Sequence, residues 1–158
     1  MAVSPIPPGH HTITPYLMLR DPAAAMEFYK KAFGAIELVR MLMPDGKSIM
    51  HAAMKIGDSI FFMATEGPGM PMASPETAGT TTVALHLYVP DVDASFAKAV
   101  AAGATVAMPP MDMFWGDRFG KVTDPFGHHW SIATHVEDLS PEEMCKRGAE
   151  AMKNMDKK

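Results

Sequence analysis

Apolar residues recur along the chain with strand-like spacing, then helix-like spacing, then strand-like spacing again. Alternating positions predict a strand over 12–20, which ends at Asp21-Pro22. Asp is a good helix N-cap and Pro suits the first helical position, so we expect a helix over 22–33, with Gly34 at its C-terminal end. Three further strands are predicted, at 36–43, 48–56 and 59–65.

The same order of elements returns in the second half of the chain. Residues 66–80 are rich in proline and glycine and have no periodicity, which is typical of a linker. After them a strand is predicted over 82–89, a helix over 92–102, and strands at 104–108, 118–123 and 129–135. LMLRD at 17–21 aligns with LYVPD at 87–91, so the sequence predicts duplication of one supersecondary unit.

These elements predict an α+β fold made of two βαβββ modules. The expected boundaries are an extended arm at 1–11, a first module at 12–66, a linker at 67–81, a second module at 82–136 and a C-terminal helix within 137–158. Ser140 and Pro141 are suited to begin that helix. A single module leaves an apolar sheet face uncovered, so two modules or two chains must come together.

Composition limits the classes of partner. The net charge of −4 and the absence of a Lys/Arg cluster argue against a nucleic-acid partner. The longest purely apolar run, 60–64, is too short to cross a membrane, and the N-terminus does not resemble a signal peptide. The one cysteine, Cys145, allows no internal disulfide. We therefore expect a cytoplasmic protein.

The stretch 114–135 contains two predicted strands joined by a turn, DPFG at 124–127. Proline presets φ for the second position of a turn, and glycine accepts the positive φ that often closes one. This turn resembles the last hairpin of the vicinal oxygen chelate superfamily, which contains glyoxalases, bleomycin-resistance proteins and extradiol dioxygenases. The longer string, with FWG at 114–116, Arg118 and Gly120, is similar to the PhnB-like branch.

The resemblance implies an open, cupped sheet formed by the paired modules around a cavity. It also implies four metal-ligand positions, which in the superfamily's enzymes usually hold His, Glu or Gln. In this chain those positions are Thr14, Ala84, Ser131 and a residue near Phe62. Alanine and phenylalanine cannot bind a metal, and hydroxyls are poor ligands for zinc or iron. We therefore expect no cofactor and no metal at the usual positions.

Strand side chains alternate between faces, so parity predicts which of them line the cup. His86 shares a face with Ala84 and Tyr88, and Tyr16 holds the equivalent place in the first module. His51 lies in mid-strand among apolar neighbours. These groups either orient a ligand or make structural hydrogen bonds. The full set of expected ligand-binding residues is Tyr16, His51, Phe62, His86, Tyr88, Trp115, Arg118 and Ser131.

The residues on either side of the DPFG turn have different expected positions. Arg118 either binds an anionic ligand at the cavity rim or pairs with Asp117 or Asp124. His128 and His129 are expected to face solvent or the rim. Trp115 either lines the cavity or packs against other side chains. Trp130 has the parity opposite to that of Ser131, so we expect it in the core under a helix.

Three functions compete. The first, which we favour, is metal-free binding of a small organic ligand, as in bleomycin-resistance proteins. The second is a metal-dependent lyase, isomerase or dioxygenase whose divalent metal lies at a relocated site that includes His51 and His86. The third is a protein whose cavity has no dedicated ligand. In each case we expect a homodimer, because the arm, the terminal helix and the open cup leave apolar surface exposed.

Overall fold

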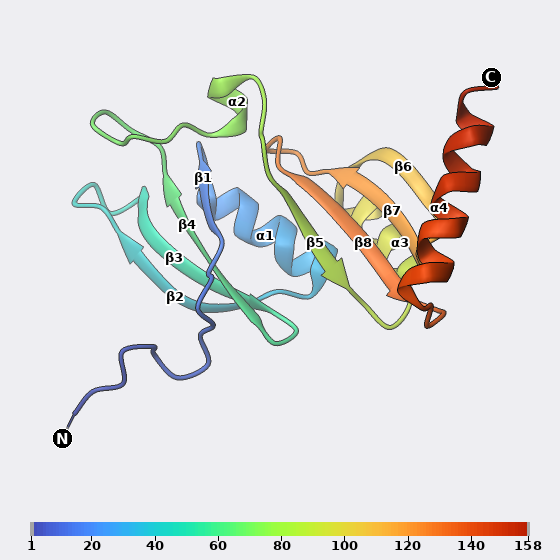
Figure 1. The fold of residues 1–158 in the computed structure, drawn as a ribbon. Coiled ribbons are helices and arrows are strands. Elements are labelled where there is room, and N and C mark those ends of the chain that lie inside the picture. The colour runs from blue at the N-terminus through green and yellow to red at the C-terminus, as the bar shows by residue number, and fades with distance from the viewer. Residues whose placement is uncertain (1, 158) are drawn as a thin grey trace.

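The computed structural model describes residues 2–157. Residues 1 and 158, the outer ends of the predicted arm and C-terminal segment, lie outside the described residues. The predicted α+β fold is confirmed: two βαβββ modules follow one another along the chain and a helix ends it (Figure 1). Among residues 2–157, no helix is long and apolar enough to cross a membrane.

The first module forms a four-stranded sheet with the strand order β1-β4-β3-β2. Strand β1 runs parallel to β4, and the other pairs are antiparallel. Asp21 caps the helix through a hydrogen bond from the backbone N–H of Ala24, as its place before Pro22 predicts. The elements are β1 (Tyr16–Leu19), α1 (Pro22–Phe33), β2 (Ile36–Leu42), β3 (Ile49–Ile56) and β4 (Ser59–Thr65).

The second module repeats this topology with the strand order β5-β8-β7-β6. Its elements are β5 (Ala84–Tyr88), α3 (Val92–Ala102), β6 (Thr105–Asp112), β7 (Asp117–Thr123) and β8 (His129–His135). The linker contains one short helix, α2 (Pro75–Ala78), which the sequence did not predict. The C-terminal helix, α4 (Pro141–Met155), is capped by Ser140 as expected.

Two strands differ from their predicted limits next to prolines. Strand β1 begins at Tyr16 rather than at residue 12, because Pro15 has no N–H to donate to a ladder. Thr14 therefore lies before the strand. Strand β6 continues through Pro109 and Pro110 to Asp112, four residues beyond its predicted end. It is an edge strand, where a missing N–H is tolerated.

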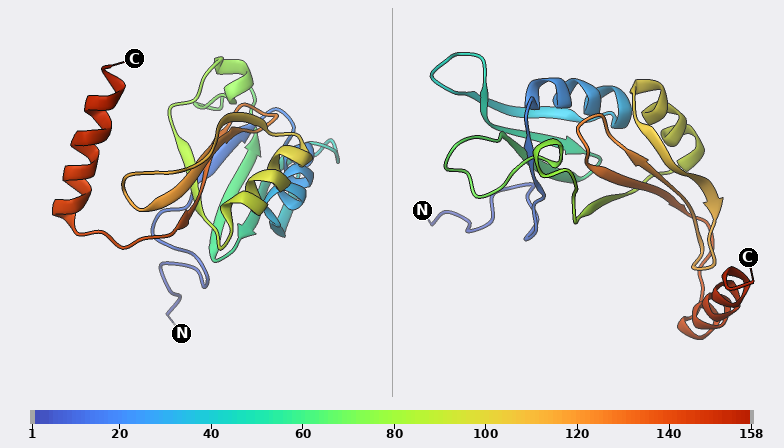
Figure 2. Two further views of the ribbon diagram at one scale, coloured as in Figure 1. Left: turned by 90° about the vertical axis from the view of Figure 1, so that its right-hand side faces the viewer. Right: turned by 90° about the horizontal axis from the view of Figure 1, so that it is seen from above.

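Helices α1 and α3 lie next to each other on the same side of the two sheets, and the opposite faces of both sheets are open (Figures 1 and 2). Within residues 2–157 no β ladder joins one sheet to the other. Helix α4 stands apart from this body, as both views in Figure 2 show. The modules are therefore held together on their helical side, which leaves the sheet faces accessible.

Aromatic side chains fill the junction between the modules. Trp130 of β8 is 2% exposed, and its ring centroid lies 4.6 Å from that of Phe33 and 5.3 Å from that of Tyr29, both in α1. The prediction that Trp130 belongs in the core is confirmed. Phe126, from the turn before β8, packs edge-on against Phe28 of the same helix. The second module's hairpin thus packs on the first module's helix.

One buried carboxylate organises this junction. Asp124 is 4% exposed, and its Oδ2 accepts hydrogen bonds from the Tyr29 hydroxyl at 2.7 Å and from Trp130 Nε1 at 2.9 Å. Its Oδ1 accepts the backbone N–H groups of Phe126 and His128, each at 2.9 Å. Burial, followed by the charge of Asp124, raises the pKa of the Tyr29 phenol well above its usual range. Tyr29 therefore stays a hydrogen-bond donor.

We expect Asp124→Ala to lower the free energy of unfolding by about 3 kcal/mol or more, because it leaves two buried donors without a partner. Tyr29→Phe, which removes one donor, should cost about 1.5–3 kcal/mol. Urea denaturation followed by circular dichroism measures both. Asp58, an exposed residue in the turn between β3 and β4, provides a matched control. Asp58→Ala should change the free energy of unfolding by no more than about 0.5 kcal/mol. Equal effects of Asp124→Ala and Asp58→Ala would contradict this account.

Candidate functional site

The open face of the second sheet carries a row of polar side chains from three strands. Ser131 of β8 pairs in register with His86 of β5 on one side and with Lys121 of β7 on the other. Residues in register share a face, so the three side chains lie on the same side. Their neighbours of opposite parity, such as Trp130 and Val122, are buried under the helices. His86 and Ser131 thus face away from the helical layer.

Aromatic rings surround this row. His86 Nδ1 and Ser131 Oγ share a hydrogen bond of 2.6 Å. The imidazole stacks on Phe119, with centroids 5.7 Å apart, and meets the edge of Tyr88 at 4.7 Å. Trp115 lies against Phe119 at 5.5 Å. The structure therefore brings His86, Ser131, Tyr88 and Trp115 together, and it adds Phe119.

The first sheet carries the equivalent positions with different residues. Tyr16 pairs in register with Phe62, as His86 does with Ser131. The Tyr16 hydroxyl and His51 Nδ1 share a hydrogen bond of 3.0 Å, and the His51 ring lies 4.9 Å from that of Phe62. The N-terminal arm folds back so that His10 also reaches Phe62, at 5.8 Å. Tyr16, His51 and Phe62 thus form one cluster on the open face.

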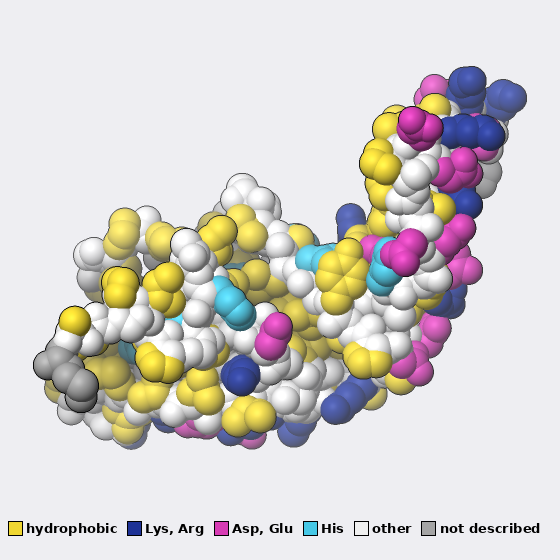
Figure 3. Space-filling model, turned by 60° about the horizontal axis from the view of Figure 1, so that its bottom comes forward, with side chains coloured by type: hydrophobic (Ala, Val, Ile, Leu, Met, Phe, Trp, Pro, Cys, Tyr) yellow, Lys and Arg dark blue, Asp and Glu magenta, His cyan; other side chains and the backbone are white. Residues whose placement is uncertain are grey.

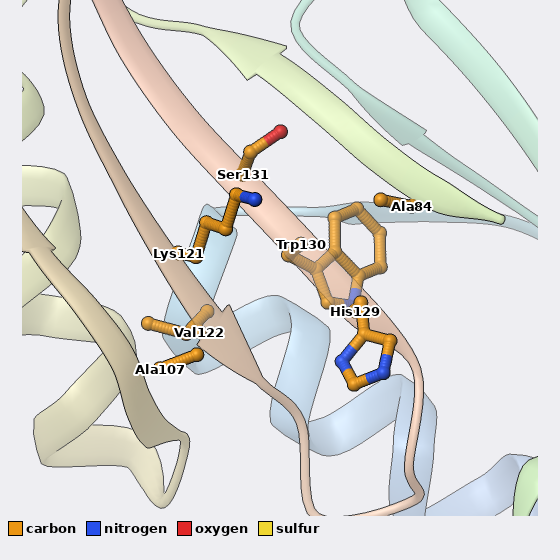
Figure 4. A pocket seen from close by; sticks show the side chains of 7 residues that line it. All are labelled: Ala84, Ala107, Lys121, Val122, His129, Trp130 and Ser131. Carbon is orange, nitrogen blue, oxygen red and sulfur yellow. The ribbon is translucent and has the colours of Figure 1, made fainter. Parts of the chain in front are cut away.

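Two hollows border the cluster on the second sheet. The first, of about 290 Å³, lies on the open face of the second sheet (Figure 4). Its lining includes Lys121, His129 and Ser131. The second, of about 770 Å³, lies between the β3–β4 turn and β5, and His86 and Tyr88 contribute to it. The two hollows offer room for a small molecule beside the polar row.

A buried carboxylate fixes the aromatic rim. Asp117 is 3% exposed and accepts hydrogen bonds from the Tyr88 hydroxyl at 3.0 Å, Trp115 Nε1 at 3.1 Å and His135 Nδ1 at 2.8 Å. Burial alone would raise the pKa of Asp117, but these hydrogen bonds outweigh it and hold the pKa below its usual value. The same bond to Asp117 raises the pKa of Tyr88. Tyr88 and Trp115 are therefore positioned by a residue that the sequence did not single out.

His135 joins this carboxylate to a second one. Its Nε2 lies 2.8 Å from Asp138 Oδ1, and its pKa is raised by the hydrogen bonds to Asp138 and then to Asp117. A raised folded-state pKa means that the bridge stabilises the fold below the ordinary histidine pKa. Its contribution is lost as the pH rises through the folded-state pKa.

Two expectations for the hairpin were wrong. Arg118 does not pair with Asp117 or Asp124; its guanidinium binds Asp93 of α3 at 2.8 Å and Asp112 at 3.2 Å. It lies on the helical side because its parity is opposite to that of Phe119. His128 does not face solvent: it is 8% exposed, and its Nε2–H donates to the carbonyl oxygen of Met18 at 3.1 Å. His129 is exposed, as expected.

Known proteins share both the sequence pattern and this arrangement of modules. The profile of the Glyoxalase/Bleomycin resistance protein/Dioxygenase superfamily matches residues 9–132. The chain belongs to this superfamily. The resemblance seen in the hairpin is therefore confirmed.

Relatives of this superfamily member include the protein Mb0911c of Mycobacterium bovis, which is 44% identical over 135 residues, or 84% of this chain and 88% of that protein. TioX from Micromonospora sp. ML1, whose crystal structure is known, is 30% identical in sequence to this chain. The two structures superpose with a TM-score of 0.64 over 80% of this chain and 99% of that one. A PhnB protein from Bacillus cereus, 19% identical with a TM-score of 0.62 over 78% and 99% of the two chains, shares the fold.

The four positions that the resemblance implies for a metal offer two hydroxyl oxygens at most. Thr14 precedes β1, Ala84 has no donor, the residues next to Phe62 are apolar, and Ser131 is hydrogen-bonded to His86. Two hydroxyls do not supply the three strong ligands that zinc or iron sites use. Within residues 2–157 no three His, Cys, Asp or Glu side chains lie close enough to hold a metal ion. These donors do not fit the superfamily's usual metal.

We expect substoichiometric zinc, nickel, iron and manganese in protein purified without an affinity tag, as measured by plasma mass spectrometry. The same protein should show no glutathione-dependent turnover of methylglyoxal, since two hydroxyl donors cannot hold a Lewis-acid metal. The opposite result would be one metal per chain, bound through His51 or His86, whose removal by a chelator abolishes an activity. That result would favour the hypothesis of a metal-dependent enzyme with a relocated metal site.

Proposed function

We propose that this protein binds a small organic ligand on the open sheet faces without the superfamily's metal. The observation that carries the proposal is the contact between His86, Ser131 and Phe119, where hydrogen-bonding groups lie on an aromatic floor. Small-molecule sites typically combine an apolar lining with a few convergent polar groups. The weak donors at the usual metal positions favour this function over a metal-dependent reaction.

The first sheet supplies the apolar part of the proposed site. Tyr16 and Phe62 meet edge-to-face at 5.6 Å, and Met18 lies on the same strand face as Tyr16. Aromatic faces bind planar organic groups through stacking and burial of apolar area. A ligand held between the two clusters would contact rings from one sheet and hydrogen-bonding groups from the other.

A second copy of the chain would complete this site. On the open face of the first sheet, Ile36, Val39 and Met41 are 63%, 42% and 47% exposed. Figure 3, in which the lower edge of the molecule in Figure 1 comes forward, shows hydrophobic side chains scattered over the two modules and along one side of α4. Large contiguous apolar surfaces are rarely left uncovered in monomers. We therefore propose a homodimer in which the open faces of two chains enclose the ligand.

Sedimentation equilibrium should give twice the 17.1 kDa chain mass at micromolar concentration. Met41→Lys, which places a charge on the open face, should shift the equilibrium toward monomer, because an unpaired charge would be buried at the interface. The control is Ala97→Lys, which places the same charge at an exposed position of α3 on the helical side. A single 17 kDa species of the unaltered protein at micromolar concentration would refute the dimer.

Ligand binding is tested by measuring melting temperatures against a library of aromatic natural products. A ligand at a hundred times its Kd stabilises a protein by about 2.7 kcal/mol, which raises Tm by roughly 5–10 °C. We expect at least one compound to reach this shift. If none shifts Tm across the library, the hypothesis of a cavity without a dedicated ligand is favoured instead.

His86→Ala should weaken binding of such a compound by about tenfold, because it removes a hydrogen-bonding group from the site. Its effect on stability should be small, since the imidazole lies on an open face rather than in packed core. Calorimetric titration gives the affinity, and urea denaturation of the free protein gives the stability. A loss of several kcal/mol in stability with unchanged affinity would assign His86 a structural role.

A further inference from the structure

The polar row on the second sheet contains a cation that the sequence did not bring to attention. Lys121 pairs in register with Ser131, and Ser131 pairs with His86, so an ammonium, a hydroxyl and an imidazole follow one another across three strands. Lys121 and Ser131 line the hollow of about 290 Å³, which is shown in Figure 4. His129 also lines this hollow, and it lies two residues before Ser131 on the same face of β8.

Lys121 lies beside an aromatic ring rather than a carboxylate. Its Nζ is 5.7 Å from the centroid of Phe119, a distance typical of a cation–π contact. Among residues 2–157, none of the ion pairs involves Lys121. Arg118, the cation expected from sequence to bind an anion, is by contrast held by two aspartates on the helical side.

The carboxylate on the same sheet face is already satisfied. Asp117 Oδ1 accepts from His135, and Oδ2 accepts from both Tyr88 and Trp115. Both oxygens of the carboxylate therefore accept hydrogen bonds from the aromatic rim and from His135, and Asp117 holds the rim side chains in position. The hollow is therefore bordered by the ammonium of Lys121, the hydroxyl of Ser131 and the imidazole of His129, which together favour an oxyanion.

We infer that the site takes a small organic anion with an aromatic body, whose oxyanion lies between Lys121 and Ser131. This inference rests on the proposed function and specifies its ligand class. Lys121 supplies the positive charge, Ser131 and His86 supply hydrogen bonds, and the Phe119 ring packs against the ligand's aromatic part. A charge-assisted hydrogen bond is about twice as strong as a neutral one, so the anion is preferred over a neutral isostere.

The experiment compares two probes that differ in charge and share their shape, 2-naphthoate and 2-naphthamide. Calorimetric titration of the 158-residue protein should show that naphthoate binds about tenfold more tightly, with an affinity that falls as salt is added. Lys121→Met should abolish this preference while leaving naphthamide binding within about twofold, since the aliphatic stem is retained.

Lys98→Met is the matched control. Lys98 is an exposed lysine of α3 on the helical side, so the substitution changes net charge equally without touching the open face. It should keep the preference for naphthoate. Circular dichroism and Tm of both variants should match the unaltered protein, because both side chains are exposed.

Three results would overturn the inference, and they separate the anion site from the proposed function. Equal affinity for the two probes, or a preference for naphthoate that survives Lys121→Met, removes the anion site and leaves the proposed small-molecule site in place. Failure of both probes to bind at millimolar concentration counts against the proposed function as well as the anion site.

Discussion

The buried carboxylate of Asp124 is the contact on which the arrangement of the two modules depends. It comes from the turn of the second module and accepts the hydroxyl of Tyr29 in the first. The same turn places Phe126 against α1, while Gly127, at φ +89°, passes so close to Pro75 that a Cβ would lie 2.8 Å from it. The DPFG turn is therefore more than a tight connection. Its Asp and Phe both meet α1, and its Gly passes close to Pro75 of α2.

Holding the modules by their helices has a consequence for the sheets. Because α1 and α3 lie together, the two open faces do not cover each other within one chain, and no ladder joins the sheets among residues 2–157. Apolar side chains such as Ile36 and Met41 therefore remain exposed. The interaction that makes the monomer one body thus also creates the surface that the proposed dimer would cover.

Local rules predicted the elements and part of the site. Periodicity and caps located both helices of the modules, and strand parity placed Trp130 in the core. The same parity argument, applied from Ser131 across the hairpin, would have found Lys121, because Thr123 pairs with His129 and Lys121 with Ser131. Arg118 was expected either to bind an anion at the rim or to pair with Asp117 or Asp124, because its chemistry was considered without its register. His128 could not be placed locally, since its partner, Met18, lies in the other module.

Duplication followed by divergence explains why the two open faces differ. Equivalent ladder positions hold Tyr16 and His86, Phe62 and Ser131, and Ala53 and Lys121. In each pair the second module carries the group with more polar or charged character, so the repeat is symmetric in backbone and asymmetric in chemistry. Two identical faces would bind an unsymmetrical ligand equally well in either direction. In the proposed cup, an apolar face opposite a basic one gives a ligand with one polar end a single preferred orientation, because only one direction pairs its charge with Lys121.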